Sequence, residues 1–214
     1  MRQPRDTRAF TLLELLVVMG IVAVLAALLS PLLSRAKKMS ETAKCTEQLR
    51  QMGLAMTAYA EDHAEFLPAA HTVVQWTSTN PVAWTRALLP YFQTKKLLTC
   101  PEFQRLHNRS SFNYFMGSRA AFVEAGGQAA SVQLSKIRLA SQYILSGDTN
   151  FPFPQEDADP DNYTQDTLFS AESTGHCRKL NVLFADGHVS SHRHFDPASM
   201  TYSYESPGMN WDFP

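Results

Sequence analysis

The stretch that decides the fold is LLELLVVMGIVAVLAALLSPLL, residues Leu12–Leu33. Its apolar run is interrupted only by Glu14, Gly20, Ser30 and Pro31. A helix that crosses a bilayer needs about 20 mostly apolar residues, whereas the apolar core of a secretory signal peptide is only about 7–15 residues long. The sequence therefore predicts a membrane-spanning helix over residues 10–33.

The charges on either side of this stretch bear on the orientation of the predicted helix. Basic residues flank the stretch on both sides, at Arg2, Arg5, Arg8, Arg35, Lys37 and Lys38. Because both flanks are basic, the positive-inside rule does not settle the orientation of the helix.

The formal net charge of the 214 residues is −1 and no long basic run is present. A nucleic-acid partner is therefore not expected.

Glu14 does not fit a plain membrane anchor. An ionised side chain costs on the order of 3 kcal/mol at the centre of a membrane helix, and less near its end. Such a group usually pairs with another polar group. A packed assembly of helices would supply a cation for Glu14 from a neighbouring chain, whereas a single anchor would not.

The decapeptide AFTLLELLVV, residues 9–18, resembles the processing motif of type IV prepilins and type II secretion pseudopilins. The resemblance implies that a prepilin peptidase cuts between Ala9 and Phe10 on the cytoplasmic side, and that the new Phe10 amine is N-methylated. It also implies that Glu14 pairs with the Phe10 amine of an adjacent subunit during assembly. Pro31 falls where pilins often carry a helix-kinking proline. Ala9 departs from the family, which usually has glycine before the cut.

The helix is expected to continue beyond the membrane to about His63, because no proline follows Pro31 until Pro68 and helix formers dominate. An apolar stripe at spacings of three or four predicts that this half packs beneath a globular head. The stripe consists of Met39, Ala43, Thr46, Leu49, Met52, Met56 and Tyr59. The domain prediction is a leader at 1–9, a transmembrane half at 10–33, an amphipathic half at 34–66 and a head at 67–214.

The head carries shorter signals. Residues 82–91 predict a short helix closed by Pro90. Strands are predicted at 111–116, 141–146, 180–185 and 189–194. Asp186-Gly187 predicts a two-residue hairpin turn between the last two strands. One long helix followed by a small antiparallel sheet is an α+β, pilin-like fold.

A second resemblance covers the head. His176, nine intervening residues and Asp186-Gly187 form a pattern similar to the H-X9-DG signature of a large group of prepilin-processed bacterial proteins. Further segments that agree in order are Cys45, 49–53, Tyr59, Leu67-Pro68, Cys100-Pro101 and 146–148. The resemblance implies a fold and an export route, and no defined biochemical activity.

Two groups of side chains in the head are candidates for metal binding. His188, His192 and His194 alternate along a predicted strand and would share one face, beside Asp186, His176 and Asp148. The alternative, which the pattern favours, is a hairpin with a solvated strand face. Asp157, Asp159 and Asp161 have the alternate spacing of calcium loops, but Asn162 and Leu168 replace the glycine and glutamate of an EF-hand. A solvated acidic loop is expected there, with a nonstandard calcium site as the alternative.

Three cysteines leave at least one thiol without a disulfide partner. If the head is exported, disulfides can persist there. Cys45 with Cys100 is the preferred pair, Cys100 with Cys177 is the alternative, and buried thiols remain possible.

The sequence predicts a structural subunit of a type IV pilus or secretion pseudopilus, held in the inner membrane with its head exported, and not an enzyme. Its expected partners are a prepilin peptidase and other pilins or pseudopilins. No cofactor is expected, apart from the metal ion considered above. The alternative is an exported, membrane-anchored binding or metal-binding module that does not polymerise.

Overall fold

The computed structural model describes residues 11–71, 73–92, 94–107, 111–118, 121, 124–126, 129, 131–149, 157–160 and 179–204. The chain divides into two compact units, Met1–Ser40 and Glu41–Pro214. The long helix α1, Leu12–Asp62, contributes its first part to one unit and its second part to the other. It ends one residue before the predicted His63 and continues through Pro31. The kink expected at Pro31 stays a prediction.

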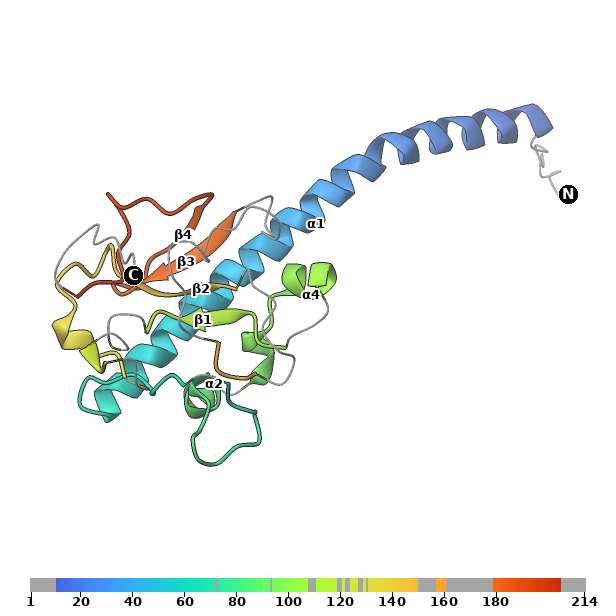
Figure 1. Cartoon of the computed structure of the whole chain (residues 1–214). Coiled ribbons are helices and arrows are strands. Elements are labelled where there is room, and N and C mark those ends of the chain that lie inside the picture. The colour runs from blue at the N-terminus through green and yellow to red at the C-terminus, as the bar shows by residue number, and fades with distance from the viewer. Residues whose placement is uncertain are drawn as a thin grey trace, which may run out of the picture. The chain divides into compact units, whose positions relative to one another are not determined.

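The second unit contains an antiparallel sheet of four strands in the order β1-β2-β3-β4. The strands are β1, Tyr114–Met116, β2, Ile144–Asp148, β3, Leu180–Phe184, and β4, Val189–His192. Figure 1 shows this sheet beside the second part of α1. The α+β, pilin-like fold is therefore confirmed. Four predicted strand boundaries were wrong by two or three residues. The starts of β1 and β2 and the end of β4 were placed too far out, because the flanking residues do not enter the hydrogen-bonded ladder, whereas β2 continues to Asp148 because Asp148 pairs with Tyr114.

Both faces of strands β1, β2 and β3 are buried, and the alternation of side chains along the strands separates two clusters. Tyr114, Met116, Leu145 and Leu183 point to the cluster that contains the helix residues Leu49, Met52 and Met56. The opposite face contributes Phe115, Ile144, Val182 and Phe184 to a cluster completed by Met200 and Tyr202. The chain after β4 therefore covers the face that α1 leaves open.

The buried face of α1 differs from the predicted stripe. Its buried residues are Cys45, Gln48, Leu49, Met52, Gly53, Ala55, Met56 and Ala60. Met39 is 74% exposed and Ala43 is exposed, so the prediction was wrong for both. Met39 lies in the first unit, before the helix meets the head, and Ala43 lies on the solvent side of the helix. At Gly53, an added Cβ would lie 3.1 Å from Leu183 Cδ1, so glycine lets α1 lie close to β3.

Four short helices lie between α1 and β1 in the described chain, and a 3-10 turn lies between β1 and β2. They are α2, Trp84–Ala87, α3, Leu89–Phe92, the 3-10 turn Lys95–Leu98, α4, Pro101–His107, and the 3-10 turn Leu134–Lys136. The single helix predicted at 82–91 is thus two, because the chain turns at Leu88. Pro90 does not close the segment. It occupies the second position of α3, where a missing backbone N–H leaves no bond unmade.

Candidate functional site

The N-terminus of α1 is closed by a reciprocal pair of hydrogen bonds between Thr11 and Glu14. The Glu14 backbone N–H donates to Thr11 Oγ1 at 3.2 Å. The Thr11 backbone N–H and hydroxyl donate to Glu14 Oε2 at 2.9 and 2.8 Å. This is a capping box, with threonine before the first helical residue and glutamate three residues later. Glu14 therefore has a local role in one chain through Oε2. Ala9 and Phe10 lie outside the described residues, so the cleavage site stays a prediction.

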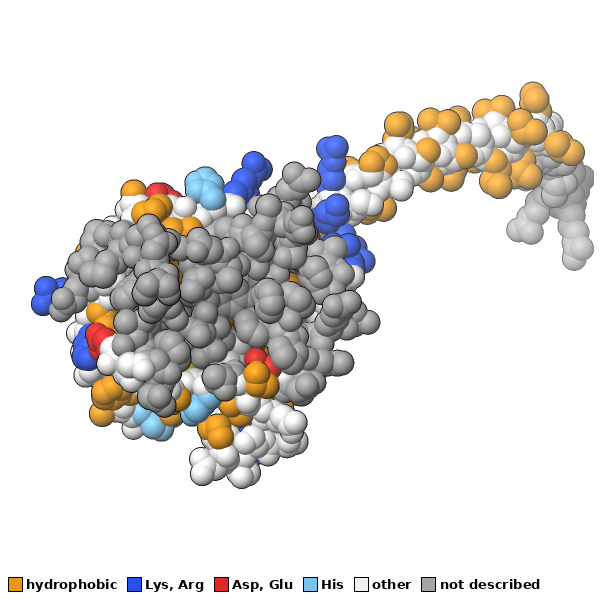
Figure 2. All heavy atoms as spheres, in the orientation of Figure 1, with side chains coloured by type: hydrophobic (Ala, Val, Ile, Leu, Met, Phe, Trp, Pro, Cys, Tyr) orange, Lys and Arg blue, Asp and Glu red, His pale blue; other side chains and the backbone are white. Residues whose placement is uncertain are grey.

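Residues 12–33 of α1 are all exposed, although nearly all are apolar. Leu12 is 81% exposed and Leu28 is 69% exposed. Figure 2 shows hydrophobic side chains covering this part of the helix. Among the described residues, α1 is the one helix long and apolar enough to cross a membrane. Since a helix that is apolar all round is normally surrounded by lipid or by other helices, this segment needs an environment that the chain itself does not supply.

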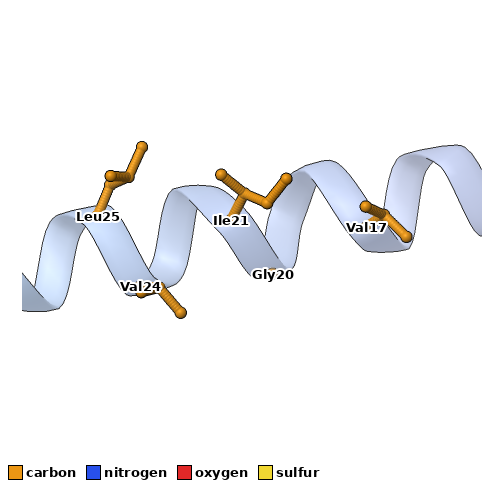
Figure 3. A pocket seen from close by; sticks show the side chains of 5 residues that line it. All are labelled: Val17, Gly20, Ile21, Val24 and Leu25. Carbon is orange, nitrogen blue, oxygen red and sulfur yellow. The ribbon is translucent and has the colours of Figure 1, made fainter.

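A shallow notch interrupts this apolar surface at Gly20. Val17, Ile21, Val24 and Leu25 line the notch, and Figure 3 shows their side chains around the bare backbone of Gly20. An added Cβ at Gly20 would meet nothing within 4 Å. Small residues allow close approach of helices inside membranes. The notch gives this face of α1 a place where a second helix can lie close to its backbone.

Asp186 and Gly187 turn the chain between β3 and β4. The Gly187 N–H donates to the Phe184 carbonyl at 2.9 Å, and the Phe184 N–H donates to the His188 carbonyl at 2.9 Å. The loop therefore has three residues, Ala185 to Gly187, and not the two that were predicted. Gly187 has φ +88°, as the last position of such a loop requires. Asp186 Oδ1 accepts the His188 N–H at 3.1 Å and lies 2.6 Å from His188 Nδ1.

Two family models match the chain. Residues 4–30 match the prokaryotic N-terminal methylation motif, and residues 41–114 match a protein of unknown function (DUF1559). The first match covers Thr11, Glu14 and the apolar helix described above. The chain is a prepilin-like protein. The H-X9-DG group to which its head is similar is consistent with the second match. No curated protein and no solved structure matches the chain.

The match to the N-terminal methylation motif, together with the apolar helix, supports anchoring of the prepilin-like chain in a membrane by a single span. The motif that gives the match its description belongs to proteins methylated at the N-terminus. The methylated residue predicted here, Phe10, lies within the matched residues 4–30. The apolar helix and the motif thus occupy one continuous segment of the sequence.

Residues of the segments that resemble the H-X9-DG group also link the strands of the sheet. Asp148 Oδ2 on β2 accepts the Asn181 N–H at 2.8 Å and its side-chain amide at 2.9 Å. Ser191 on β4 donates to Asn181 Oδ1 at 2.6 Å. Since Asn181 belongs to the H-X9-DG segment, the motif carries a buried polar link across three strands as well as the turn. His176 lies outside the described residues, and its role stays a prediction.

Two of the three histidines that were candidate metal ligands, His188 and His192, are engaged with neighbouring side chains. The His188 ring stacks on Phe184 at 4.3 Å between centroids. His192 Nε2 lies 2.5 Å from Ser190 Oγ, and burial lowers the pKa of the His192 imidazole. Strand β4 ends at His192, so His194 does not continue the alternation that was predicted. Within the described part of the chain, no three His, Cys, Asp or Glu side chains gather as a metal site would require.

Asp157 and Asp159 are buried, so the prediction of a solvated acidic loop was wrong for both. Asp159 accepts the His71 N–H through Oδ2 and the Trp84 N–H through Oδ1, each at 2.5 Å. Asp157 Oδ1 accepts the Val74 N–H at 3.2 Å. The carboxylates thus satisfy backbone donors of the loops that precede α2, and burial raises the pKa of Asp159 to about 7. Asp161 lies outside the described residues.

A buried polar cluster joins α1 to the segment before α4, and sequence reasoning missed it. Gln48 donates to the carbonyls of Lys96 and Thr99 at 3.0 and 3.2 Å. It accepts a hydrogen bond from the Tyr114 hydroxyl at 3.0 Å. The only signal in the sequence was a glutamine between the buried Cys45 and Leu49. Its partners are 48 or more residues away, which no local pattern reveals.

Cys45 and Cys100 are both buried at this cluster, and the structure has them as thiols and not as a disulfide. The structure therefore does not contain the predicted disulfide between Cys45 and Cys100, although both cysteines belong to one hydrophobic cluster. Cys177 lies outside the described residues.

Proposed function

We propose that the chain is a structural subunit of a type IV pilus or a secretion pseudopilus. A prepilin peptidase cleaves it between Ala9 and Phe10, and the head is exported while residues 10–33 hold it in the inner membrane. The observation that carries the proposal is Glu14, a carboxylate at the start of an apolar, wholly exposed helix within the N-terminal methylation motif.

Assembly replaces lipid around α1 with other copies of α1. Helices in lipid associate through packing and polar contacts, because lipid tails are as apolar as leucine side chains. The notch at Gly20 favours close packing, and Glu14 favours one axial register. Its capping bonds use Oε2, which leaves Oε1 for the methylated Phe10 amine of a neighbour. An isolated subunit thus holds its carboxylate in the cap, and a neighbour adds a charge-assisted hydrogen bond.

The function is structural, and the head needs no catalytic centre for it. Three of its buried carboxylates, Asp148, Asp157 and Asp159, accept hydrogen bonds within the sheet and its loops. The alternative remains an exported, membrane-anchored module that does not polymerise. An anchored module has no use for Glu14, whereas a filament depends on it.

Intact mass and N-terminal analysis of the membrane-expressed chain, with and without a prepilin peptidase, tests the proposal. We expect a peptidase-dependent product that begins at methylated Phe10. Phe10→Asp should abolish this product while leaving membrane insertion intact, because the substitution alters the cleavage site and not the apolar run. An uncleaved chain, or one cut after Leu33, would contradict the proposal and favour the anchored module.

A further inference from the structure

We propose that Cys45 and Cys100 form a disulfide in the exported protein, and that this bond fixes the first buried turn of α1 to the head. The inference rests on export of the head, as proposed above, for the compartment in which the bond forms. Its geometric basis is independent of filament assembly, since every residue involved belongs to the second unit.

The backbone of the two segments is held together at this point. Cys45 and Gln48 lie one turn apart on the same face of α1, as residues three positions apart do. Gln48 binds the carbonyl of Thr99, the residue directly before Cys100, at 3.2 Å. The Cys100 N–H donates to Asn113 Oδ1 at 3.0 Å. The peptide group between Thr99 and Cys100 is thus held at its carbonyl by the helix and at its N–H by Asn113.

The Tyr114 hydroxyl lies beside Gln48 and Cys45, in the same buried region as Cys100. Tyr114 donates to Gln48, and the same hydroxyl forms a hydrogen bond with Cys45. Burial raises the pKa of the Tyr114 hydroxyl well above its usual range, and the neighbouring Cys45 and Cys100 thiols add to that rise. Cys45 and Cys100 thus belong to one buried cluster, with Gln48 and Tyr114 between their two segments. Cys45 and Cys100 are 0% and 1% exposed.

The bond forms by thiol–disulfide exchange with an external disulfide, either a low-molecular-weight disulfide or that of an exported dithiol oxidase. One cysteine thiolate attacks the external disulfide, forms a mixed disulfide and releases one thiol. The second cysteine then attacks the mixed disulfide and releases the other thiol. Two protein thiols are oxidised and one external disulfide is reduced. Because both cysteines are buried once the head is folded, exchange occurs while the head folds, and the completed bond resists reduction.

The position of the pair suggests its purpose. Cys45 is the first buried residue of α1, so it lies where the helix begins to be covered by the head. A pull along α1 would start to separate the helix from the head at this turn. A disulfide here would add a covalent link to the segment before α4, beside the non-covalent contacts of Gln48 and the ion pair between Glu41 and Arg105.

Peptide mapping of the purified full-length chain tests the pairing directly. The chain is refolded in detergent micelles with a mixture of oxidised and reduced glutathione, quenched in acid and alkylated in denaturant. Trypsin then separates the cysteines, with Cys45 on residues 45–50, Cys100 on residues 97–105 and Cys177 on residues 139–178. We expect 45–50 joined to 97–105, lighter by two hydrogens than the sum of the separate peptides, and Cys177 alkylated.

Alkylation of all three cysteines under the oxidising mixture would overturn the inference, and so would a link between Cys100 and Cys177. The N-terminal mass of the membrane-expressed chain reports cleavage independently. A linked 45–50 and 97–105 pair in a chain that is never cleaved would retain the disulfide and contradict the proposed function. A cleaved, exported chain without the link would support the proposed function and overturn the disulfide.

Matched variants test the effect of the bond. Under oxidising conditions, Cys45→Ala and Cys100→Ala should each lower the thermal midpoint by about 5–15 °C, whereas Cys177→Ala should leave it within about 2 °C. Adding a phosphine reductant in denaturant before refolding should lower the midpoint of the wild type, with little further effect on Cys45→Ala. Equal midpoints for the oxidised and reduced wild type would contradict the fixing role of the bond.

Discussion

Helix α1 passes through two environments within one continuous element. In residues 12–33, apolar side chains surround the helix and all are exposed. In residues 45–60, apolar side chains occupy one face and are buried against the sheet. The second part packs into the core of the head, whereas the first part is buried by no other segment in the described part of the chain. Helix α1 thus joins an apolar segment that is exposed, and so available to lipid or other helices, to a segment that packs against the head.

Alanine substitution of two glycines gives the largest contrast between the first part of α1 and the head. A Cβ at Gly117 would lie 2.0 Å from the Ile144 carbonyl oxygen, so Gly117→Ala must displace the backbone of β2. We expect a loss of about 4 kcal/mol or more in unfolding free energy. Gly20→Ala meets no atom within 4 Å and should leave the stability of the head unchanged. Urea unfolding in detergent, followed by tryptophan fluorescence, measures both. Equal midpoints for the two variants would contradict the contrast.

Leucines on the two sides of the second part give the next effect. Leu49 is 0% exposed, and Leu49→Ala should cost about 2–5 kcal/mol through lost burial and a cavity. Leu54, on the same helix, is 72% exposed, and Leu54→Ala should change the unfolding free energy by about 0.5 kcal/mol at most. The same urea titration compares the two variants. A similar loss at both positions would mean that the buried face of α1 has been assigned incorrectly.

Asp159 gives a smaller, pH-dependent effect confined to the head. Its pKa is raised from 3.8 to about 7, so the folded state binds the proton more tightly than the unfolded state. Its stabilising contribution is present below about pH 4 and is lost as pH rises to about 7. Relative to Asp159→Asn, the wild type should therefore lose about 1–3 kcal/mol between pH 5 and pH 8.

His71 supplies the control for this titration. Its Nδ1 lies 3.7 Å from Asp159 Oδ2, and burial lowers the pKa of the His71 imidazole. The unfolding free energy of His71→Gln minus that of the double variant His71→Gln/Asp159→Asn should fall as pH rises, as it does for the wild type minus Asp159→Asn. A difference that does not change with pH would show that Asp159 does not titrate in this range.

The sequence predicted the parts of the fold that depend on local periodicity. The end of α1 was correct to one residue, and the turn at Asp186-Gly187 was located because glycine takes the positive φ there. Helix α4 was missed, although Pro101 occupies its first position, where proline is favoured.

Contacts between segments that are far apart in the chain could not be predicted from the sequence. The acidic residues Asp157 and Asp159 looked solvated because their partners, the backbone N–H groups of residues 71–84, leave no trace in the composition. Gln48 was hidden for the same reason. The N-terminal motif was readable because its chemistry lies within a few consecutive residues, as the Thr11–Glu14 pair illustrates.

The most direct test of the central claim is filament yield for Glu14→Leu against Leu13→Ala, expressed with a prepilin peptidase and an assembly system. Yield is measured as sheared filament protein per processed chain that begins at Phe10. We predict that Glu14→Leu loses about tenfold or more, since removing a contact worth about 1.4 kcal/mol changes an equilibrium tenfold, and that Leu13→Ala assembles normally. Wild-type filament yield from processed Glu14→Leu would contradict the role of Glu14 and favour a membrane-anchored head that does not polymerise.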